Sequence, residues 1–468
     1  MIRLASLLAL LAVAAAPAVA QDFPPTPPAP APPSAFEIPE GRTFALANGV
    51  DVTLVPYGDL PKASVNVAVR VGNVDEGPGE TALADFVAGL LTEGTTSRTG
   101  EQIAQEAAEM GGSVFASASL DQTNVGGRVL SEFTPDLIRL VGDIVQNPAF
   151  DAEAFTRIQR DQVRGAAVGR SQPGSVALAA FRRVLYGEHP YASIILPKAD
   201  DLEAVSPAAV RDFYARTIGP ARTRVYVVGK FDEAAVEAAI REAFGGWASS
   251  VQPADPVPPT AATGRRIVLV DQPGAAQSQV YVGIPTIDPS AGEDYVTLSV
   301  TNALLGGSFG SRITRNIRED KGYTYSPGSS VSSRFRNAYW AESAAVVTES
   351  TGPAVREILH EIDSLATTPP SADELAGIQN YLAGTFVLQN STPGGIAGFL
   401  AFMDLHGLDR EYLETYTQRV YAVTPDDVQR TTRDLLRGDD MTIVVVGDRA
   451  TVEPQLAELG TVEIETID

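Results

Sequence analysis

The sequence repeats one structural pattern twice, and this duplication constrains the fold more than any other feature. Residues 423–448 repeat the pattern of residues 206–230, in which an amphipathic helix leads into an apolar strand. The strands at 265–285 repeat two strands near 49–72, which we expect to form a hairpin. Two related halves that each mix strands and helices predict two α+β domains.

Segments of unusual composition mark the limits of these halves. Residues 1–20 have a basic start, an apolar run and an Ala-Val-Ala end, which together predict a signal peptide cleaved after Ala20. We therefore expect an exported, periplasmic protein without stable membrane insertion. A proline-rich stretch at 21–42 predicts a tether, and a Pro/Ala-rich stretch at 248–264 predicts a linker. The two domains are accordingly predicted at 43–247 and 265–468.

Composition excludes several classes of function. The chain has 35 basic and 58 acidic side chains, a net charge of −23, so a nucleic-acid phosphate backbone would be repelled. It contains no cysteine, which excludes disulfides, thiolate metal ligands and a cysteine nucleophile. A phosphate-binding P-loop motif is not present in the sequence.

The segment at 304–330, LLGGSFGSRITRNIREDKGYTYSPGSS, carries the most chemical information. We expect a helix that stops at Gly306 and Gly307, then a second helix with one face formed by positions 309, 313 and 317, then a strand from about 323. Arg318 would lie at a helix end and Tyr325 at a strand start. A guanidinium and a phenol placed in this way can hold a peptide backbone and donate a hydrogen bond to a carbonyl oxygen. The simpler alternative is an arginine that caps a helix and a tyrosine that packs.

This string resembles the second-half signature of the pitrilysin/insulinase family of zinc peptidases. The matching positions are the two glycines, Ser311-Arg312, Ile317-Arg318-Glu319, Gly322 and Tyr325-Ser326. The resemblance implies two homologous domains, each an antiparallel sheet covered by helices, which form a clamshell around a cavity. It implies that Gly306, Gly307 and Ser311 belong to a substrate loop. It also implies that Arg318 and Tyr325 assist a zinc site held by the other half or by another subunit.

The zinc motif expected from this resemblance is missing. Family peptidases carry H-x-x-E-H on the helix that corresponds to 79–93, with a further acidic ligand about 76 residues later. Those positions are occupied here by Asp85, Ala88, Gly89 and Gly165. A single carboxylate cannot hold zinc, and alanine and glycine supply neither a ligand nor a general base. We therefore expect no metal and no cofactor in this chain.

The histidines do not replace the missing ligands. The chain contains three, His189, His360 and His406, and none lies within a helical turn of another in the sequence. Each is therefore interpreted as a structural or surface residue.

These observations favour a non-catalytic subunit of a heteromeric zinc metallopeptidase. The resemblance implies a related partner subunit that carries H-x-x-E-H and the zinc, with Arg318 and Tyr325 lent to the joint site for peptide degradation. One alternative is a stand-alone peptide-binding or chaperone-like periplasmic protein without proteolytic activity. Another is a hydrolase that acts alone, and retained zinc in the purified chain would support it.

Overall fold

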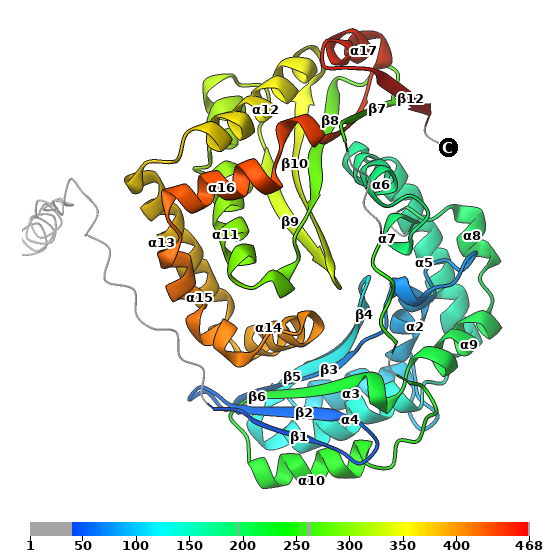
Figure 1. The fold of residues 1–468 in the computed structure, drawn as a ribbon. Helices are drawn as coiled ribbons and strands as arrows, with labels where there is room; N and C mark the ends of the chain where they lie inside the picture. Colours follow the sequence, from blue (N-terminus) through cyan, green and yellow to red (C-terminus); the bar gives the residue numbers. More distant parts are fainter. Residues whose placement is uncertain (1–39, 194–195, 253, 260–263, 467–468) are drawn as a thin grey trace, which may run out of the picture. The chain divides into compact units, whose positions relative to one another are not determined.

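The computed structural model describes residues 40–193, 196–252, 254–259 and 264–466 (Figure 1). The predicted signal peptide, most of the predicted tether and part of the predicted linker lie outside these residues. Their boundaries, and the domain limits next to them, stay predictions. Among the described residues, none of the helices combines the length and apolar character that a membrane crossing requires.

The first half of the chain builds a six-stranded sheet. In spatial order its strands are β1 (Arg42–Ala45), β2 (Asp51–Pro56), β6 (Thr223–Gly229), β3 (Lys62–Val69), β5 (Thr123–Leu130) and β4 (Ser113–Ala118). Strands β3, β5 and β4 pair antiparallel, whereas β2 and β6 run parallel, so the sheet is mixed. The strands of this sheet all lie within residues 42–229.

The second half repeats this arrangement in a separate sheet (Figure 1). In spatial order its strands are β12 (Val462–Thr466), β7 (Arg266–Asp271), β11 (Thr442–Gly447), β8 (Gln277–Thr286), β10 (Asn337–Val347) and β9 (Gly328–Arg334). Strands β7, β11, β8, β10 and β9 take the same order as β2, β6, β3, β5 and β4. The predicted architecture of two α+β domains is therefore confirmed.

The strands expected near 49–72 and 265–285 are present, but they do not pair with each other as hairpins. Strand β6 lies between β2 and β3, and β11 lies between β7 and β8. Both inserted strands are mostly apolar and almost completely buried, as is typical of strands at the centre of a sheet. A strand that returns from far along the sequence therefore takes the place that the local hairpin would have used.

Helices cover one face of each sheet. In the first half α2 contacts β4 and β5, α4 contacts β3 and β5, and α10 packs on α4; in the second half α12 contacts β8 and β10 and α17 contacts β7. The first half contains α2 (Leu83–Leu91), α3 (Gly100–Glu109), α4 (Thr134–Gln146), α5 (Ala152–Arg170), α6 (Pro173–Tyr186), α7 (Pro190–Ser193), α8 (Ala199–Ala204), α9 (Pro207–Thr217) and α10 (Glu233–Phe244). The second contains α11 (Glu293–Asn302), α12 (Thr351–Thr367), α13 (Ala372–Gln389), α14 (Pro393–His406), α15 (Arg410–Ala422), α16 (Pro425–Leu435) and α17 (Arg449–Ala457).

The opposite face of each sheet is covered by a helix from the other half. Helix α6 packs on β8 and β11, with Phe181 completely buried among second-half residues such as Val444. Helix α14 packs on β3 and β6, where Ile396 is buried beside Tyr226 and Val228. This exchange buries apolar side chains that neither half could bury alone, so it joins the two halves. The clamshell cavity between them stays a prediction.

Candidate functional site

The two glycines at 306 and 307 are the last residues of a helical segment, so the helix stops where their pattern predicts. Helix α11 continues into a π-helical turn, Ala303–Gly307, and the chain leaves the helix at Ser308. A Cβ atom at Gly306 would lie 2.3 Å from Glu342 Oε2 and 2.6 Å from Ser329 Oγ, and one at Gly307 would lie 2.4 Å from Asn302 Nδ2. A side chain at either position would displace these neighbours, which favours glycine at both.

The second helix of the segment is also π-helical and spans Thr314–Asp320. Ile313 and Ile317 are completely buried, as their spacing predicts, but Phe309 lies before the helix and is 71% exposed. Two of the three residues expected on the apolar face, Ile313 and Ile317, are therefore buried. Ser311 is buried and donates a hydrogen bond to Thr314 Oγ1 at 2.9 Å. Its side chain supports the start of this helix and does not line a cavity.

The regular strand begins later than the alternation from 323 suggests. Gly322 adopts a left-handed conformation with a φ of 66°, and Thr324 forms an isolated bridge with Val346. Strand β9 starts at Gly328, directly after Pro327, which has no N–H to give to a ladder. Tyr325 consequently stands on an irregular loop, and its side chain is 81% exposed.

Arg318 lies between two exposed aromatic rings. Its Cζ atom is 4.5 Å from the ring centre of Phe309 and 5.0 Å from that of Tyr325. Such cation–π contacts orient a guanidinium without using its N–H groups. In the described part of the chain Arg318 forms no ion pair, so these donors are available to a ligand. The structure therefore brings Arg318 and Tyr325 together and adds Phe309 to them.

The three side chains border a cavity of about 400 Å³. Its lining residues come from the glycine turn, the second π-helix, the loop before β9 and helix α13, and they include Gly306, Gly307, Arg318, Tyr325, Ser329 and Tyr381. Arg312 holds this region to α13, because its guanidinium donates two hydrogen bonds of 2.8 Å to Glu374. Tyr381 and Glu374 lie in a helix whose sequence carries no distinguishing motif, so sequence pattern alone does not point to them.

A buried acid lies directly behind the glycine turn. Glu342 on β10 is completely buried, and neither carboxylate oxygen has a partner at hydrogen-bond geometry within the described residues. Burial raises the pKa of Glu342 well above its ordinary value, because the charged carboxylate is not solvated there. The sequence offers one sign of this residue: a single charge inside the apolar strand Ala338–Val347, which the sequence analysis did not use.

Of the four degenerate zinc positions, only Asp85 carries a side chain that could bind a metal ion. The Asp85 carboxylate on α2 accepts a hydrogen bond of 2.7 Å from Asn73 Nδ2, and burial raises the pKa of Asp85. Ala88 is buried, Gly89 faces Ile158, and Gly165 on α5 is exposed. One carboxylate and three positions without donor atoms do not fit a zinc ion, which takes at least three protein ligands.

Asp85 belongs instead to a polar cluster at the start of α2. Asn73 Nδ2 also donates to Glu76, whose carboxylate accepts hydrogen bonds of 2.9 and 3.0 Å from the backbone N–H groups of Ala82 and Ala84. Burial raises the pKa of Glu76 to about 7. Glu76 thus satisfies amides at the start of the helix, a role that needs no metal.

The histidines lie in unrelated surroundings. His189 Nε2 is 2.8 Å from the carbonyl oxygen of Val257, and His360 is exposed. The His406 ring lies 4.6 Å from that of Phe402 at an angle of 54°, and burial lowers the pKa of His406 to about 4. Within the part of the chain that the structure describes, no three histidine, aspartate or glutamate side chains come together as metal ligands.

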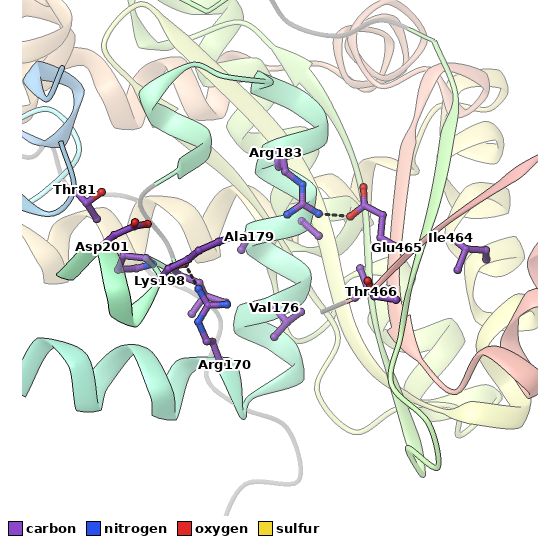
Figure 2. Close-up of a pocket in the computed structure, with 14 residues that line it drawn as sticks. Thr81, Arg170, Val176, Ala179, Arg183, Lys198, Asp201, Ile464, Glu465 and Thr466 are labelled. Atoms are coloured by element: carbon purple, nitrogen blue, oxygen red, sulfur yellow. Dashed lines mark hydrogen bonds and ion pairs between the residues drawn. The ribbon is translucent and has the colours of Figure 1, made fainter. Parts of the chain in front are cut away.

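A second cavity, of about 680 Å³, lies where α6 approaches β12 (Figure 2). Arg183 forms an ion pair with Glu465, and Arg170 donates a hydrogen bond of 3.0 Å to the carbonyl oxygen of Leu196. Its lining contains none of the residues that the sequence analysis selected. We therefore locate the candidate site at Arg318 and Tyr325.

Two family patterns match the chain in succession. The family described as Insulinase (Peptidase family M16) matches residues 57–194, which contain all four degenerate zinc positions. The family described as Peptidase M16 inactive domain matches residues 204–382, which contain Arg318 and Tyr325.

Curated relatives match the chain along most of its length. An uncharacterized zinc protease of Mycobacterium tuberculosis is 29% identical over 413 residues, covering 87% of this chain and 92% of the relative. An uncharacterized zinc protease of Streptomyces coelicolor is 25% identical over 418 residues, covering 87% of this chain and 89% of the relative.

Solved structures show the same fold. The crystal structure of a peptidase M16 inactive domain from Pseudomonas fluorescens matches with a TM-score of 0.81 at 23% identity, covering 87% of this chain and 98% of that one. A protease from Helicobacter pylori matches with a TM-score of 0.81 at 18% identity, covering 88% and 100%. The two family patterns, the relatives and the shared fold agree, and the chain belongs to peptidase family M16, the insulinase family.

Proposed function

We propose that this chain is the non-catalytic subunit of a heteromeric, periplasmic zinc metallopeptidase. It binds the peptide and contributes Arg318 and Tyr325 to a site whose metal ligands belong to a related partner subunit with H-x-x-E-H. The observation that carries the proposal is the contrast between the two halves. Three of the four positions that would hold zinc have no donor atoms and the fourth is the single carboxylate of Asp85, whereas Arg318 lies between Phe309 and Tyr325 beside a cavity.

The exposed phenol of Tyr325 suits it to stabilise developing charge. When water attacks a peptide carbonyl, negative charge builds on the carbonyl oxygen, and a donor aimed at that oxygen lowers the barrier. Tyr325 is 81% exposed, so its O–H can reach a group outside this chain. Arg318 orients the Tyr325 ring through the cation–π contact and keeps its N–H donors for the backbone carbonyls of the peptide.

Replacement of Tyr325 by phenylalanine tests this role. The partner is the H-x-x-E-H family member that co-purifies with the tagged chain from its source organism. Tyr325→Phe removes the donor but keeps the ring beside Arg318, so kcat of the pair should fall by about 10²- to 10³-fold. KM and the association of the subunits should stay near their original values.

Two measurements control this experiment. Tyr381→Phe removes a phenol from the same cavity outside the Arg318 stack, and it should change kcat by less than about threefold. Elemental analysis should find zinc in the pair and no stoichiometric zinc in the isolated chain. Turnover by the Tyr325→Phe pair within about twofold of the original would remove the catalytic role and leave a scaffold subunit.

The stand-alone peptide-binding alternative is supported by the same exposed surface. Phe309, Tyr325 and Tyr381 are large side chains with substantial exposure around one cavity, as in a surface that receives a ligand. A chain that purifies without any family partner, and that binds unfolded peptides but never cleaves them, would favour this alternative.

A further inference from the structure

Two arginines share a largely buried space where helix α6 meets the second sheet. Arg182 lies on α6 and is 9% exposed, and its Nε donates a hydrogen bond of 3.3 Å to the Tyr339 hydroxyl on β10. Tyr339 pairs with Ser332 on β9, so Arg334, two residues further along that strand, faces α6 as well. Arg334 Nη1 donates to the carbonyl oxygen of Ser333 at 2.6 Å. Within the described residues neither guanidinium forms an ion pair.

The charges around these arginines do not balance. Burial, and after it the charge of Arg182, lower the pKa of Arg334. A guanidinium nevertheless stays protonated in proteins, so loss of a proton cannot relieve either charge. The acid that acts on Arg334 is the buried Asp121, which is not in ion-pair contact with it and already accepts a hydrogen bond of 2.5 Å from the Tyr191 hydroxyl. Two buried cations thus face one acid, in a chain whose net charge is −23.

A third polar group near Arg334 also lacks a partner. His406, at the end of α14, is 7% exposed, and its Nδ1 has no hydrogen-bond partner among the described residues. Burial lowers the pKa of His406 to about 4, with the charges of Asp288 and Arg334 acting on it in opposite directions, so the ring is neutral at neutral pH. A neutral imidazole can carry its proton on Nδ1. His406 therefore adds a donor to this region and no counter-charge.

We propose that Arg182 and Arg334 hold a small inorganic anion, of the size and charge of chloride, between helix α6 and strand β9. The anion supplies the negative charge that the described residues lack, and it accepts hydrogen bonds from the remaining N–H groups of both guanidinium groups. A small ion is favoured over an acidic peptide or a phosphate ester because Arg182 is almost completely buried and neither arginine lines the cavities described above.

Such an ion acts on the contact that joins the two halves. Helix α6 belongs to the first half but packs on β8 and β11 of the second, and Arg334 belongs to the second half. An anion between the two arginines replaces a like-charge repulsion with charge-assisted hydrogen bonds from both sides. Because it binds the folded chain only, it stabilises that state in proportion to its concentration. This inference needs neither the partner subunit nor a peptide, so it is independent of the proposed function.

Chloride binding to the isolated chain tests the proposal, measured by the line width of the chloride NMR signal. The excess width should saturate with chloride concentration, and Arg334→Gln should reduce it about fivefold or more, because one of the two charges is lost. Arg334→Lys keeps the charge and should retain the excess width within about twofold. Arg336→Gln removes an exposed arginine of the same hairpin and should change it by less than about 1.5-fold. An unchanged excess width in Arg334→Gln would overturn the proposal.

Because substitution of a buried arginine can also disturb the fold, thermal unfolding of the unaltered chain gives a second measurement. At constant sodium concentration, chloride in place of gluconate, which is too large to enter, should raise Tm by about 1–3 °C. This rise should be absent in Arg334→Gln and present in Arg336→Gln. Equal Tm values of the unaltered chain in the two salts would overturn the proposal. Uptake of acetate without uptake of chloride would assign the space to a carboxylate and would equally overturn it.

Discussion

The helix of the degenerate zinc positions and the helix that precedes Arg318 take equivalent places in the repeat. Helix α2 is a regular α-helix whose relevant positions carry a hydrogen-bonded aspartate, a buried alanine and a glycine against Ile158. Helix α11 instead widens into a π-helical turn, whose glycines allow close approach to β9 and β10. Wide turns of this kind often occur at functional sites.

This difference shows which half restricts the residue types that can occupy these positions. In the first half, loss of ligand atoms leaves a packed helix that is compatible with the fold. In the second half, Gly306 lies against the side chains of Glu342 and Ser329, so each of these three residues limits what the others can be. Addition of a single methyl group should therefore have opposite effects in the two places.

The largest expected effect comes from a methyl group at Gly306. In Gly306→Ala the new Cβ would lie 2.3 Å from Glu342 Oε2 and 2.9 Å from Ser329 Cβ, so the buried Glu342 side chain and either β9 or the turn must move. Overpacking of this kind typically costs about 1–3 kcal/mol of unfolding free energy. Urea unfolding of the isolated chain measures this value. A cost below about 0.5 kcal/mol would show that the turn is free to move and would weaken the comparison.

The next effect is expected from Glu342→Gln, and its size depends on pH. Because the folded-state pKa of Glu342 is raised, the folded chain holds this proton above the pH at which the unfolded chain releases it. The group therefore reduces stability as pH rises from its unfolded value near 4.5 toward its folded value. Glu342→Gln removes this pH dependence of the unfolding free energy, whose slope is at most about 1.4 kcal/mol per pH unit.

Unfolding free energies of both proteins at several pH values between about 5 and 8 measure this difference. The matched control is Glu342→Ala, which also removes the proton but leaves a cavity, so its stability should be lower at every pH while its pH dependence follows that of Glu342→Gln. Parallel pH profiles for Glu342→Gln and the original chain would mean that Glu342 is not neutral in the fold.

The smallest effect is expected at Gly165, and its sign is reversed. This glycine lies in α5 and is exposed, and a Cβ atom added there would meet no other atom within 4 Å. Gly165→Ala should therefore stabilise the chain by about 0.5–1 kcal/mol, the usual advantage of alanine over glycine inside a helix. Thermal unfolding of the single variant measures it. Destabilisation would indicate that position 165 still has a constrained neighbour.

Local pattern was sufficient for much of the fold. The repeat at 206–230 and 423–448 led to two α+β domains, and the spacing of Ile313 and Ile317 identified a buried helical face. Patterns of this kind are reliable because each depends on side chains only a few residues apart. The loss of ligand atoms at positions 85, 88, 89 and 165 is likewise a matter of residue identity and needs no structure.

Tertiary structure decided everything that depends on contacts between distant residues. The insertion of β6 between β2 and β3, the exchange of α6 and α14, and the exposure of Phe309 beside Arg318 depend on which apolar surfaces meet. The need for glycine at 306 depends on Glu342, which lies far along the chain. Sequence alone thus determined which chemical groups the protein has and has lost, whereas packing decided which of them share a site, because burial is a property of the whole fold.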